Sequence, residues 1–339
     1  MRALVTGGAG FIGCNTAKCL GEAGWNVVVL DNLSRRGCET NLDWLRRQFS
    51  FDFVNVDIRN AEEMAEVIKT GHFDVAIHLA AQVAVTTSIL SPRLDFEVNA
   101  LGTLNLLEAI RCHSPNTVLL NASTNKVYGE LGDVAIREGE TRYELVHHPL
   151  GIAETQPLDF HSPYGCSKGA ADQYVADYAR IYGLRCVNFR QSCIYGYRQF
   201  GVEDQGWVAW FTIAHVLGKP IAIYGNGKQV RDVLFVDDLV AVYMRAIDAI
   251  DSVSGRTFNI GGGVQNTLSL LELIEYLEYL SKRKVAYSFA DWRPGDQPVF
   301  ISDIQQARLV LSWSPTVSAR EGVARLYNWV VQNRGMFDV

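Results

Sequence analysis

Short apolar runs alternate with amphipathic helical patterns along the first half of the chain, and this alternation restricts the fold more than any other feature. The strands are expected at Arg2–Thr6, Asn26–Leu30, Phe51–Val56, Val75–Leu79, Val118–Ala122 and Cys186–Phe189. Helical patterns cover Phe11–Ala23 and residues 60–70, 93–112 and 164–182. Units of strand, helix and strand build a parallel sheet, and right-handed crossovers place helices on both faces. We therefore predict an α/β fold with a doubly wound parallel sheet.

The second half of the chain is less regular and predicts a smaller α/β lobe. Its expected elements are strands at Ile221–Tyr224, Val233–Phe235 and Phe258–Ile260 and helices at Leu268–Leu280 and Arg320–Val331. A lobe of this kind would cover the carboxyl ends of the strands, where open α/β sheets bind ligands. We expect a cofactor domain of residues 1–188 and about 234–258, and a substrate lobe of about 189–233 and 259–339.

Composition excludes several classes of protein. The net charge of −6 offers no basic surface for nucleic acid. Seven cysteines occur without any CxxC pair, and His147-His148 lacks further ligands, so neither a disulfide framework nor a metal site is expected. The chain opens without a signal-peptide pattern, and no apolar run is long enough to span a bilayer. We expect a cytoplasmic protein with no membrane or nucleic-acid partner.

A glycine-rich turn joins the first strand to the first helix. Gly7, Gly10 and Gly13 fit the three requirements of a dinucleotide turn: a tight bend, close approach of the backbone to a pyrophosphate, and close packing of helix on strand. The free N–H groups at the start of the helix, at Phe11 and Ile12, would face the phosphates. An ordinary strand–turn–helix is the alternative. Because a strand precedes the turn and a helix follows it, we predict a Rossmann-type dinucleotide site.

An acidic residue at the end of the second strand indicates which dinucleotide binds. Asp31 lies 18 residues after Gly13, where a carboxylate can hold both ribose hydroxyls and repel a 2′-phosphate, so NAD is favoured over NADP. Arg35 and Arg36 leave the NADP alternative open, because they could clasp that phosphate. Asp57, after the third strand, is positioned to flank adenine, although a plain turn aspartate is nearly as good an interpretation.

Three further side chains suit proton and hydride transfer. Tyr164 and Lys168 are four residues apart and share one face if a helix has begun by Tyr164. A free tyrosine has a pKa of about 10, and a neighbouring ammonium favours the phenolate. Thr124 follows the strand Val118–Ala122, so its hydroxyl can bond the reacting oxygen. The set would deprotonate an alcohol while its carbinol hydrogen leaves as hydride. A surface helix with a snorkelling lysine is the alternative.

These motifs resemble the extended short-chain dehydrogenases/reductases of the nucleotide-sugar epimerase and dehydratase group. Beyond the turn and the Tyr164–Lys168 pair, the matching pieces are His78-Leu79-Ala80-Ala81-Gln82, Asn99, Ser123–Gly129, Tyr195-Gly196, Arg231-Asp232 and Arg293-Pro294-Gly295-Asp296. Within that group the chain is similar to CDP-tyvelose (CDP-paratose) 2-epimerases. The stretches that carry this finer resemblance are Ser123–Gly129, Leu158–Tyr174 and Asp204-Gln205-Gly206-Trp207.

The resemblance assigns roles to single residues. It implies Tyr164 as catalytic base, Lys168 as its electrostatic partner and ribose ligand, and Thr124 as a ligand of the substrate hydroxyl. The implied NAD contacts are Gly7, Gly10, Phe11, Ile12, Gly13, Asp31, Asn32, Asp57, Ile58, Leu79, Ala80, Gln82, Asn99, Tyr164 and Lys168. Arg231, Arg293 and Asp296 match positions that hold the substrate's diphosphate and ribose, and guanidinium forks suit phosphate. An interlobe salt bridge is the competing interpretation for either arginine.

Two departures from related enzymes bear on the reaction. Related dehydratases carry an acidic pair directly after the catalytic threonine, but this chain has Asn125 and Lys126, which disfavours elimination. Forty positions separate Thr124 from Tyr164, more than in typical 4-epimerases, and the extra segment is expected to cover the sugar. An inert surface insertion is the alternative. Together with these departures, the resemblance to 2-epimerases implies epimerisation at C2 of a CDP-hexose through a 2-keto sugar.

Other functions stay open at this point. A UDP-hexose 4-epimerase would use the same catalytic residues, a net oxidoreductase would release NADH, and a non-enzymatic dinucleotide-binding protein could share the fold. The resemblance further implies a homodimer or homotetramer, built in part from the helix at 164–182, and a place in the synthesis of the lipopolysaccharide O-antigen.

Overall fold

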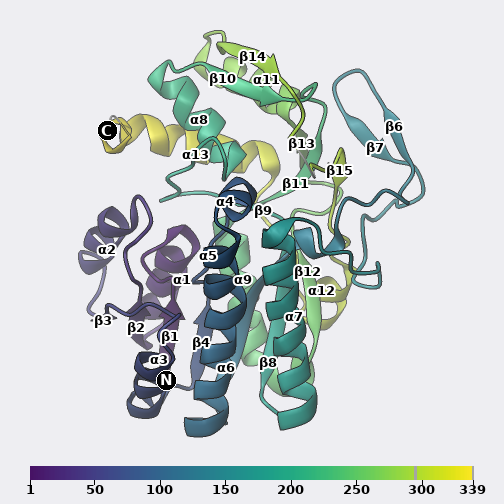
Figure 1. Ribbon diagram of the computed structural model, residues 1–339. Coiled ribbons are helices and arrows are strands. Elements are labelled where there is room, and N and C mark those ends of the chain that lie inside the picture. The colour runs from purple at the N-terminus through teal and green to yellow at the C-terminus, as the bar shows by residue number, and fades with distance from the viewer. Residues whose placement is uncertain (294–295, 338–339) are drawn as a thin grey trace.

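A seven-stranded sheet forms the larger lobe of the computed structural model, which describes residues 1–293 and 296–337 (Figure 1). Pro294 and Gly295 of the motif quoted above lie outside the described residues. The strands are parallel and run in the order β12-β8-β5-β4-β1-β2-β3. Their bounds are β1 Arg2–Thr6, β2 Asn26–Leu30, β3 Asp52–Val54, β4 Val75–His78, β5 Val118–Thr124, β8 Cys186–Gln191 and β12 Thr257–Ile260. The predicted doubly wound sheet is confirmed.

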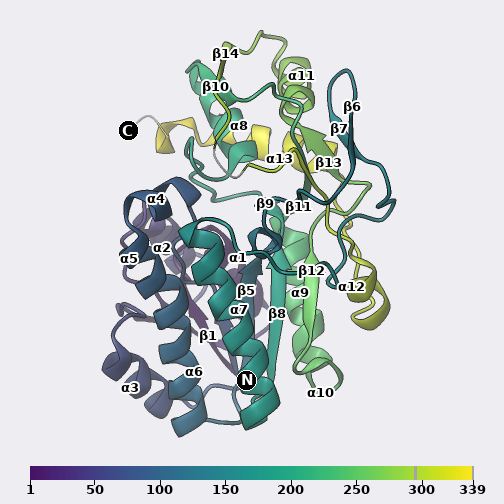
Figure 2. The ribbon, with the colours of Figure 1, turned by 45° about the vertical axis from the view of Figure 1, so that its right-hand side comes forward.

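Helices cover both faces of this sheet (Figures 1 and 2). One layer holds α3 (Ala61–Gly71), α6 (Gly102–His113) and α7 (Ser162–Tyr182), and the other holds α1 (Phe11–Glu22) and α9 (Val236–Asp248). Along β1, Ala3 and Val5 pack into the core on the α1 side, whereas Leu4 packs into the core under α6. Because both faces are buried, the strands are continuous apolar runs.

The helix expected over residues 93–112 is divided. The structure has α4 (Val85–Leu90), α5 (Pro92–Phe96) and a π-helical turn η1 (Glu97–Leu101) that leads into α6. Pro92 begins α5 because its missing N–H is tolerated in a first helical turn. Asn99 lies in this π-helical turn, beneath the carboxyl ends of the strands, and only 1% of it is exposed.

The second lobe lies over the carboxyl edge of the sheet (Figure 1). Its helices are α8 (Trp207–Leu217), α11 (Leu270–Ser281) and α13 (Ala319–Gln332). Its strands are β9 Cys193–Tyr195, β10 Ile221–Tyr224, β11 Val230–Phe235, β13 Thr267–Ser269, β14 Tyr287–Ala290 and β15 Val299–Phe300. Strand β11 is central, because it pairs with β9, β13 and β15.

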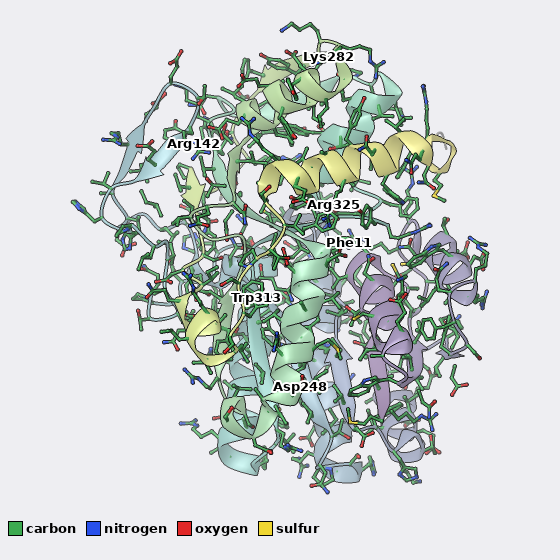
Figure 3. All side chains as sticks on the ribbon, turned by 180° about the vertical axis from the view of Figure 1, so that it is seen from behind. Phe11, Arg142, Asp248, Lys282, Trp313 and Arg325 are labelled. Atoms are coloured by element: carbon green, nitrogen blue, oxygen red, sulfur yellow. The ribbon has the colours of Figure 1, made fainter. Side chains whose placement is uncertain are left out.

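The segment between Thr124 and Tyr164 includes a β-hairpin. After the 3₁₀ turn η2 (Asn125–Tyr128), strands β6 (Ile136–Glu138) and β7 (Tyr143–Leu145) project at the side of the second lobe. Arg142 ties the hairpin to α11, because its guanidinium pairs with Glu272 at 2.5 Å; Figure 3 labels Arg142 between the hairpin and that lobe. The expected insertion is therefore an ordered element that packs against the second lobe.

Several elements differ from expectation. Strand β3 is shorter than Phe51–Val56, and β5 continues to Thr124, so Thr124 ends its strand instead of following it. The remaining elements are α2 (Cys38–Arg46), α10 (Ile250–Val253), α12 (Gln305–Val310) and the turn η3 (Arg334–Met336). None of them was predicted, and neither were the helices α4, α8 and α9 or the strands β6, β7, β9, β13, β14 and β15. Helix α8 is buried on nearly every side, so it lacks the polar stripe that reveals a surface helix.

Candidate active site

The glycine turn closes tightly against the neighbouring strand. Gly10 N donates to Gly7 O at 3.0 Å, and Cys14 N donates to Gly10 O at 2.9 Å, which begins α1. A Cβ on Gly13 would lie 2.1 Å from Gly7 O, and one on Gly7 would lie 2.7 Å from Ala80 N. Side chains are therefore excluded at both positions, and the turn rests on the backbone of Leu79–Ala80.

The first turn of α1 then offers its amides to the cleft. By helix geometry the N–H groups of Phe11, Ile12 and Gly13 have no acceptor within the helix. No side chain caps this end, since Gly10 is the N-cap residue. Figure 3 labels Phe11 at the end of α1 that faces the second lobe. A pyrophosphate fits this cradle, because backbone amides and the positive end of the helix dipole would converge on it.

Asp31 lies beside the same turn. Its carboxylate accepts from Ala9 N at 3.0 Å and from Leu33 N at 2.8 Å. Burial raises the pKa of Asp31, and these backbone hydrogen bonds oppose the rise. Each oxygen keeps a lone pair for a ribose hydroxyl, so the residue fits the role expected of it. The same carboxylate would repel a 2′-phosphate.

Of the residues expected at the adenosine end of the dinucleotide, Asn32 and Asp57 have polar side chains bonded to each other, whereas the side chain of Ile58 is buried. Asn32 donates through Nδ2 to Asp57 at 2.9 Å. The Arg59 guanidinium holds the pKa of Asp57 down to about 2. Ile58 is 4% exposed and packs under Gly102 of α6, so its side chain belongs to the core and only its backbone borders the strand ends. An adenine contact at Ile58 therefore has to be made by the main chain.

Arg35 crosses to the other lobe. Its guanidinium donates to Gln205 Oε1 at 2.7 Å, in the loop that precedes α8. Its charge also reaches Tyr164, where it opposes the rise in the pKa of the phenol. Arg35 lies in the exposed loop between β2 and α2, as the solvated-loop interpretation expected, and this loop reaches the second lobe. Arg35 could not be placed from sequence because its partner is 170 residues away.

Asn99 acts beneath the site through its neighbours. Its Oδ1 accepts from Gln82 N at 2.9 Å, and its Nδ2 donates to Ser167 Oγ at 3.1 Å. Gln82 Nε2 donates to Asp95 at 2.7 Å, and Ser167 Oγ also donates to Asp95. Asp95 is fully buried and was not singled out from the sequence. This network fixes the loop after β4 against α7, so Asn99 positions Gln82 instead of reaching into the cleft.

Thr124, Tyr164 and Lys168 come together where β5 ends and α7 begins. Helix α7 starts at Ser162, so Tyr164 and Lys168 share one face as predicted. A hydrogen bond joins the side chains of Tyr164 and Thr124. Lys168 Nζ donates to Ala122 O at 2.6 Å, at the end of the same strand. All three residues are at least nine-tenths buried, with 5% to 8% of each exposed.

The charge relationship within this set differs from the sequence expectation. Burial raises the pKa of Tyr164 to about 12, whereas an ammonium at the phenol would have lowered it. Burial also lowers the pKa of Lys168 to about 8. The reason is geometric: the Lys168 ammonium is bound by the Ala122 carbonyl, and the phenol is bound by Thr124.

The expected substrate ligands lie in the second lobe as ion pairs. Arg231 on β11 pairs with Asp296 at 2.6 Å, and Arg293 pairs with Asp204 at 2.9 Å. The Arg293 guanidinium also lies over the Tyr224 ring, 4.0 Å from its centroid. Both pairs are within one lobe, so neither is the interlobe salt bridge that sequence reasoning left as the alternative.

A buried network connects helix α7 to the segment 130–160. Asp172, one turn after Lys168, pairs with Arg190 of β8 at 2.8 Å. Arg190 donates to Tyr128 Oη at 3.1 Å, and that hydroxyl donates to Asn259 Oδ1 at 2.7 Å. Asn259 Nδ2 then donates to Ile152 O at 2.8 Å. Sequence reasoning missed all of these links, because they join four distant parts of the chain.

Other kinds of site are not supported by the described part of the chain. Within residues 1–293 and 296–337, no three His, Cys, Asp or Glu side chains gather to hold a metal ion. No helix in those ranges is long and apolar enough to cross a membrane.

A dinucleotide cradle beside a Thr–Tyr–Lys set defines a short-chain dehydrogenase/reductase. The chain matches the family model described as GDP-mannose 4,6 dehydratase over residues 4–326. It belongs to the extended short-chain dehydrogenase/reductase family of nucleotide-sugar epimerases and dehydratases. It is 48% identical to the CDP-paratose 2-epimerase of Salmonella typhi, over 97% of this chain and 99% of that protein.

Solved structures of the family have the same fold. The UDP-glucose 4-epimerase of Thermotoga maritima with UDP-glucose superposes with a TM-score of 0.83 at 30% identity, covering 98% of this chain and 100% of that one. The dTDP-glucose 4,6-dehydratase DesIV of Streptomyces venezuelae, with NAD and TYD bound, gives a TM-score of 0.85 at 28% identity and covers 100% and 99%.

Proposed function

We propose that this protein is an NAD-dependent isomerase that inverts C2 of a CDP-hexose, as in the interconversion of CDP-paratose and CDP-tyvelose. The observation that carries the proposal is the hydrogen-bonded Thr124–Tyr164 pair next to a dinucleotide turn, with the Lys168 ammonium of α7 bound to Ala122 O of the strand that carries Thr124. The identity of 48% to a CDP-paratose 2-epimerase supports the choice of carbon and nucleotide.

Oxidation solves a chemical difficulty at C2. The C2–H bond of a sugar is not acidic enough for direct loss of its proton, because no neighbouring carbonyl stabilises the carbanion. When bound, NAD supplies a reversible hydride acceptor for C2, so the cycle has no net redox change. Gly7–Gly13 and Asp31 would hold its pyrophosphate and ribose, in the cradle described above.

The protein's own groups then move one proton. Tyr164 takes the proton of the C2 hydroxyl during oxidation and returns it when the 2-keto sugar is reduced on its other face. Thr124 holds the same oxygen by a hydrogen bond. With a pKa raised to about 12, Tyr164 needs a nearby cation to become the base. We propose that the Lys168 ammonium leaves the Ala122 carbonyl, binds the nicotinamide ribose and lies close enough to Tyr164 to favour its phenolate.

The residues after Thr124 argue against elimination of water. Asn125 and Lys126 occupy the positions at which related dehydratases carry acids. This chain therefore lacks the proton donors that a 4,6-dehydratase uses at those positions. This separates the chain in chemistry from DesIV, although the folds superpose closely.

A UDP-hexose 4-epimerase is the second candidate, because it would use the same three residues and the chain is 34% identical to the UDP-glucose 4-epimerase of Mycolicibacterium smegmatis. Incubation with CDP- and UDP-sugars, followed by NMR of the products, separates the two. Inversion at C2 of a CDP-hexose supports our proposal, whereas inversion at C4 of a UDP-hexose replaces it. Stoichiometric NADH absorbance would indicate a net oxidoreductase, and no turnover of any sugar would indicate a binding protein.

We further propose a homodimer that contains α7, alone or paired into a tetramer. Helices α4, α5 and α7 and the π-helical turn η1 pack against one another, and apolar side chains are exposed along them. These residues are Ile89, Leu90, Leu94, Phe96, Leu101, Tyr174, Ile181 and Tyr182. A patch of this kind marks an interaction surface. Light scattering on the purified protein tests the proposal, and a monomer at micromolar concentration would refute it.

Location and domain limits are proposed on similar grounds. All seven cysteines are free, which supports a reducing cytoplasm.

We keep the division into an NAD domain and a nucleotide-sugar lobe, with the NAD domain extended to the ends of β8 at Gln191 and β12 at Ile260.

A further inference from the structure

Lys126 stands between the catalytic threonine and the expected phosphate ligands. Its backbone N–H donates to Thr124 Oγ1 at 3.3 Å, inside the turn η2. Its side chain extends to the second lobe, where the ammonium lies 3.5 Å from Gln297 Oε1. The residue before Gln297 is Asp296, which accepts from Arg231. Lys126 therefore spans from the hydride-transfer end of the cleft to Arg231.

Among the described residues, Lys126 makes no ion pair at this junction, whereas Arg231 does. Arg231 has the Asp296 carboxylate at 2.6 Å, whereas Lys126 has a neutral amide at the limit of hydrogen-bond distance. Burial and the Arg231 charge lower the pKa of Lys126 to about 8, against the opposing effects of Asp296 and Glu130. A buried ammonium that makes no ion pair is costly, and a phosphate oxygen between Lys126 and Arg231 would relieve that cost.

The position of the reacting carbon makes this cation useful. In a nucleoside diphosphate sugar the β-phosphate is attached to C1, so C2 is the adjacent carbon and C4 lies across the ring. An enzyme that holds the C2 oxygen on Thr124 must therefore place the β-phosphate close to that threonine. An enzyme that holds the C4 oxygen there places the phosphate at the far side of the sugar.

We propose that Lys126 binds the β-phosphate of the nucleotide sugar, together with Arg231, and thereby presents C2 instead of C4 to Thr124 and Tyr164. The inference rests on the proposed function and adds a specificity-determining residue to it. Lys126 thus has a task of its own at a position where related dehydratases carry an acid.

Binding of CDP and CMP to the NAD-loaded protein tests the proposal by calorimetry, because the two nucleotides differ by the β-phosphate. We expect Lys126→Met to weaken CDP binding tenfold or more and to change CMP binding less than twofold, the range for loss of a charge-assisted hydrogen bond. Lys126→Gln keeps the aliphatic part of the side chain and a polar end. It should weaken CDP binding and spare CMP binding in the same way, and it replaces Lys126→Met as the test if that variant folds poorly. Lys126→Arg should recover most of the affinity.

Lys219→Met, which removes an exposed lysine from the second lobe, is the control and should bind both nucleotides as the wild type does. If Lys126→Met and Lys126→Gln bind CDP with wild-type affinity, or lose CDP and CMP equally, the proposal is wrong. Failure of the wild type to act on a CDP-hexose would instead overturn the proposed function, since the comparison of CDP with CMP is read without turnover.

Discussion

Thr124 and Tyr164 are hydrogen-bonded to each other across the junction of β5 and α7. The bond aligns two hydroxyl groups from segments forty positions apart, so that a substrate oxygen can be held by both. Because α7 is anchored to the sheet and to η1, the separation of these hydroxyls is set by packed secondary structure. The catalytic geometry is therefore part of the fold.

Tyr164→Phe should abolish nearly all epimerisation while leaving the dinucleotide site intact. Removal of the hydroxyl deletes the proton acceptor, an effect of about 10²–10⁴-fold for a general base. NMR of a CDP-hexose reaction measures the turnover, and release of cofactor on denaturation measures bound NAD. Activity near that of the wild type would refute the role of Tyr164, and loss of NAD would point to a structural defect.

Asp31→Asn should weaken NAD binding and reduce the preference for NAD over NADP. The amide keeps the shape of the side chain but offers one acceptor oxygen where the carboxylate offers two, and it no longer repels a 2′-phosphate. We expect the Kd for NAD to rise about tenfold, as for loss of one charge-assisted hydrogen bond. Fluorescence titration measures both dinucleotides. Asp52→Asn, at an exposed carboxylate on β3, should leave both Kd values unchanged.

Gly13→Ala should destroy the glycine turn, because the added Cβ would lie 2.1 Å from Gly7 O. Backbone atoms cannot move aside as a flexible side chain can, so we expect loss of NAD binding and a lower Tm. Gly24→Ala is the matched control: its φ is +80° but no atom lies within 4 Å of the added Cβ. Gly24→Ala should lower the free energy of unfolding by about 1 kcal/mol, because of its positive φ, and should still bind NAD. Equal behaviour of the two variants would contradict the packing argument.

His78 should make the protein less stable as the pH falls. Burial, with the Lys168 charge, lowers the pKa of His78 to about 3, and Thr6 and Thr103 bond its ring as a neutral imidazole. In the unfolded chain the His78 imidazole binds a proton near pH 6.5, whereas in the folded protein it stays neutral. The contribution of His78 to the free energy of unfolding is therefore fully present above pH 6.5 and is lost progressively as the pH falls below it.

The loss should reach about 2 kcal/mol at pH 5. His78→Gln should lack this part of the pH dependence, whatever its stability at neutral pH. Urea unfolding of both proteins at pH 7 and pH 5 measures the difference, because the other histidines contribute equally to each. The same loss in both proteins would show that His78 is not the group responsible.

Periodicity and turn chemistry were sufficient to predict the sheet, the glycine turn and the shared face of Tyr164 and Lys168. These features depend on residues close together in sequence. The direction of the Lys168 ammonium was not predictable, because the Ala122 carbonyl that binds it belongs to a strand 46 residues earlier. The raised pKa of Tyr164 has the same origin, since its burial arises only when distant segments pack around it in the folded protein.

Other omissions had local causes. Helix α8 gave no periodic pattern because it is apolar on almost every side, and the π-helical turn before α6 has no sequence signature of its own. Asp95 looked like an ordinary helix carboxylate until the fold brought Gln82 and Ser167 to it. The bond between Arg35 and Gln205 was not predictable either, because the two residues are 170 positions apart.

The chain of contacts from Asp172 through Arg190, Tyr128 and Asn259 to Ile152 has a consequence for how substrate preference can change. Residues 130–160 are not an independent module, since the Ile152 carbonyl is bound by Asn259, which is linked through Tyr128 and Arg190 to Asp172 of α7. Transplanting residues 130–160 into a scaffold without the equivalent of Asn259 would remove a hydrogen bond to a buried carbonyl. We therefore expect changes in this segment to require matching changes in β8 and β12.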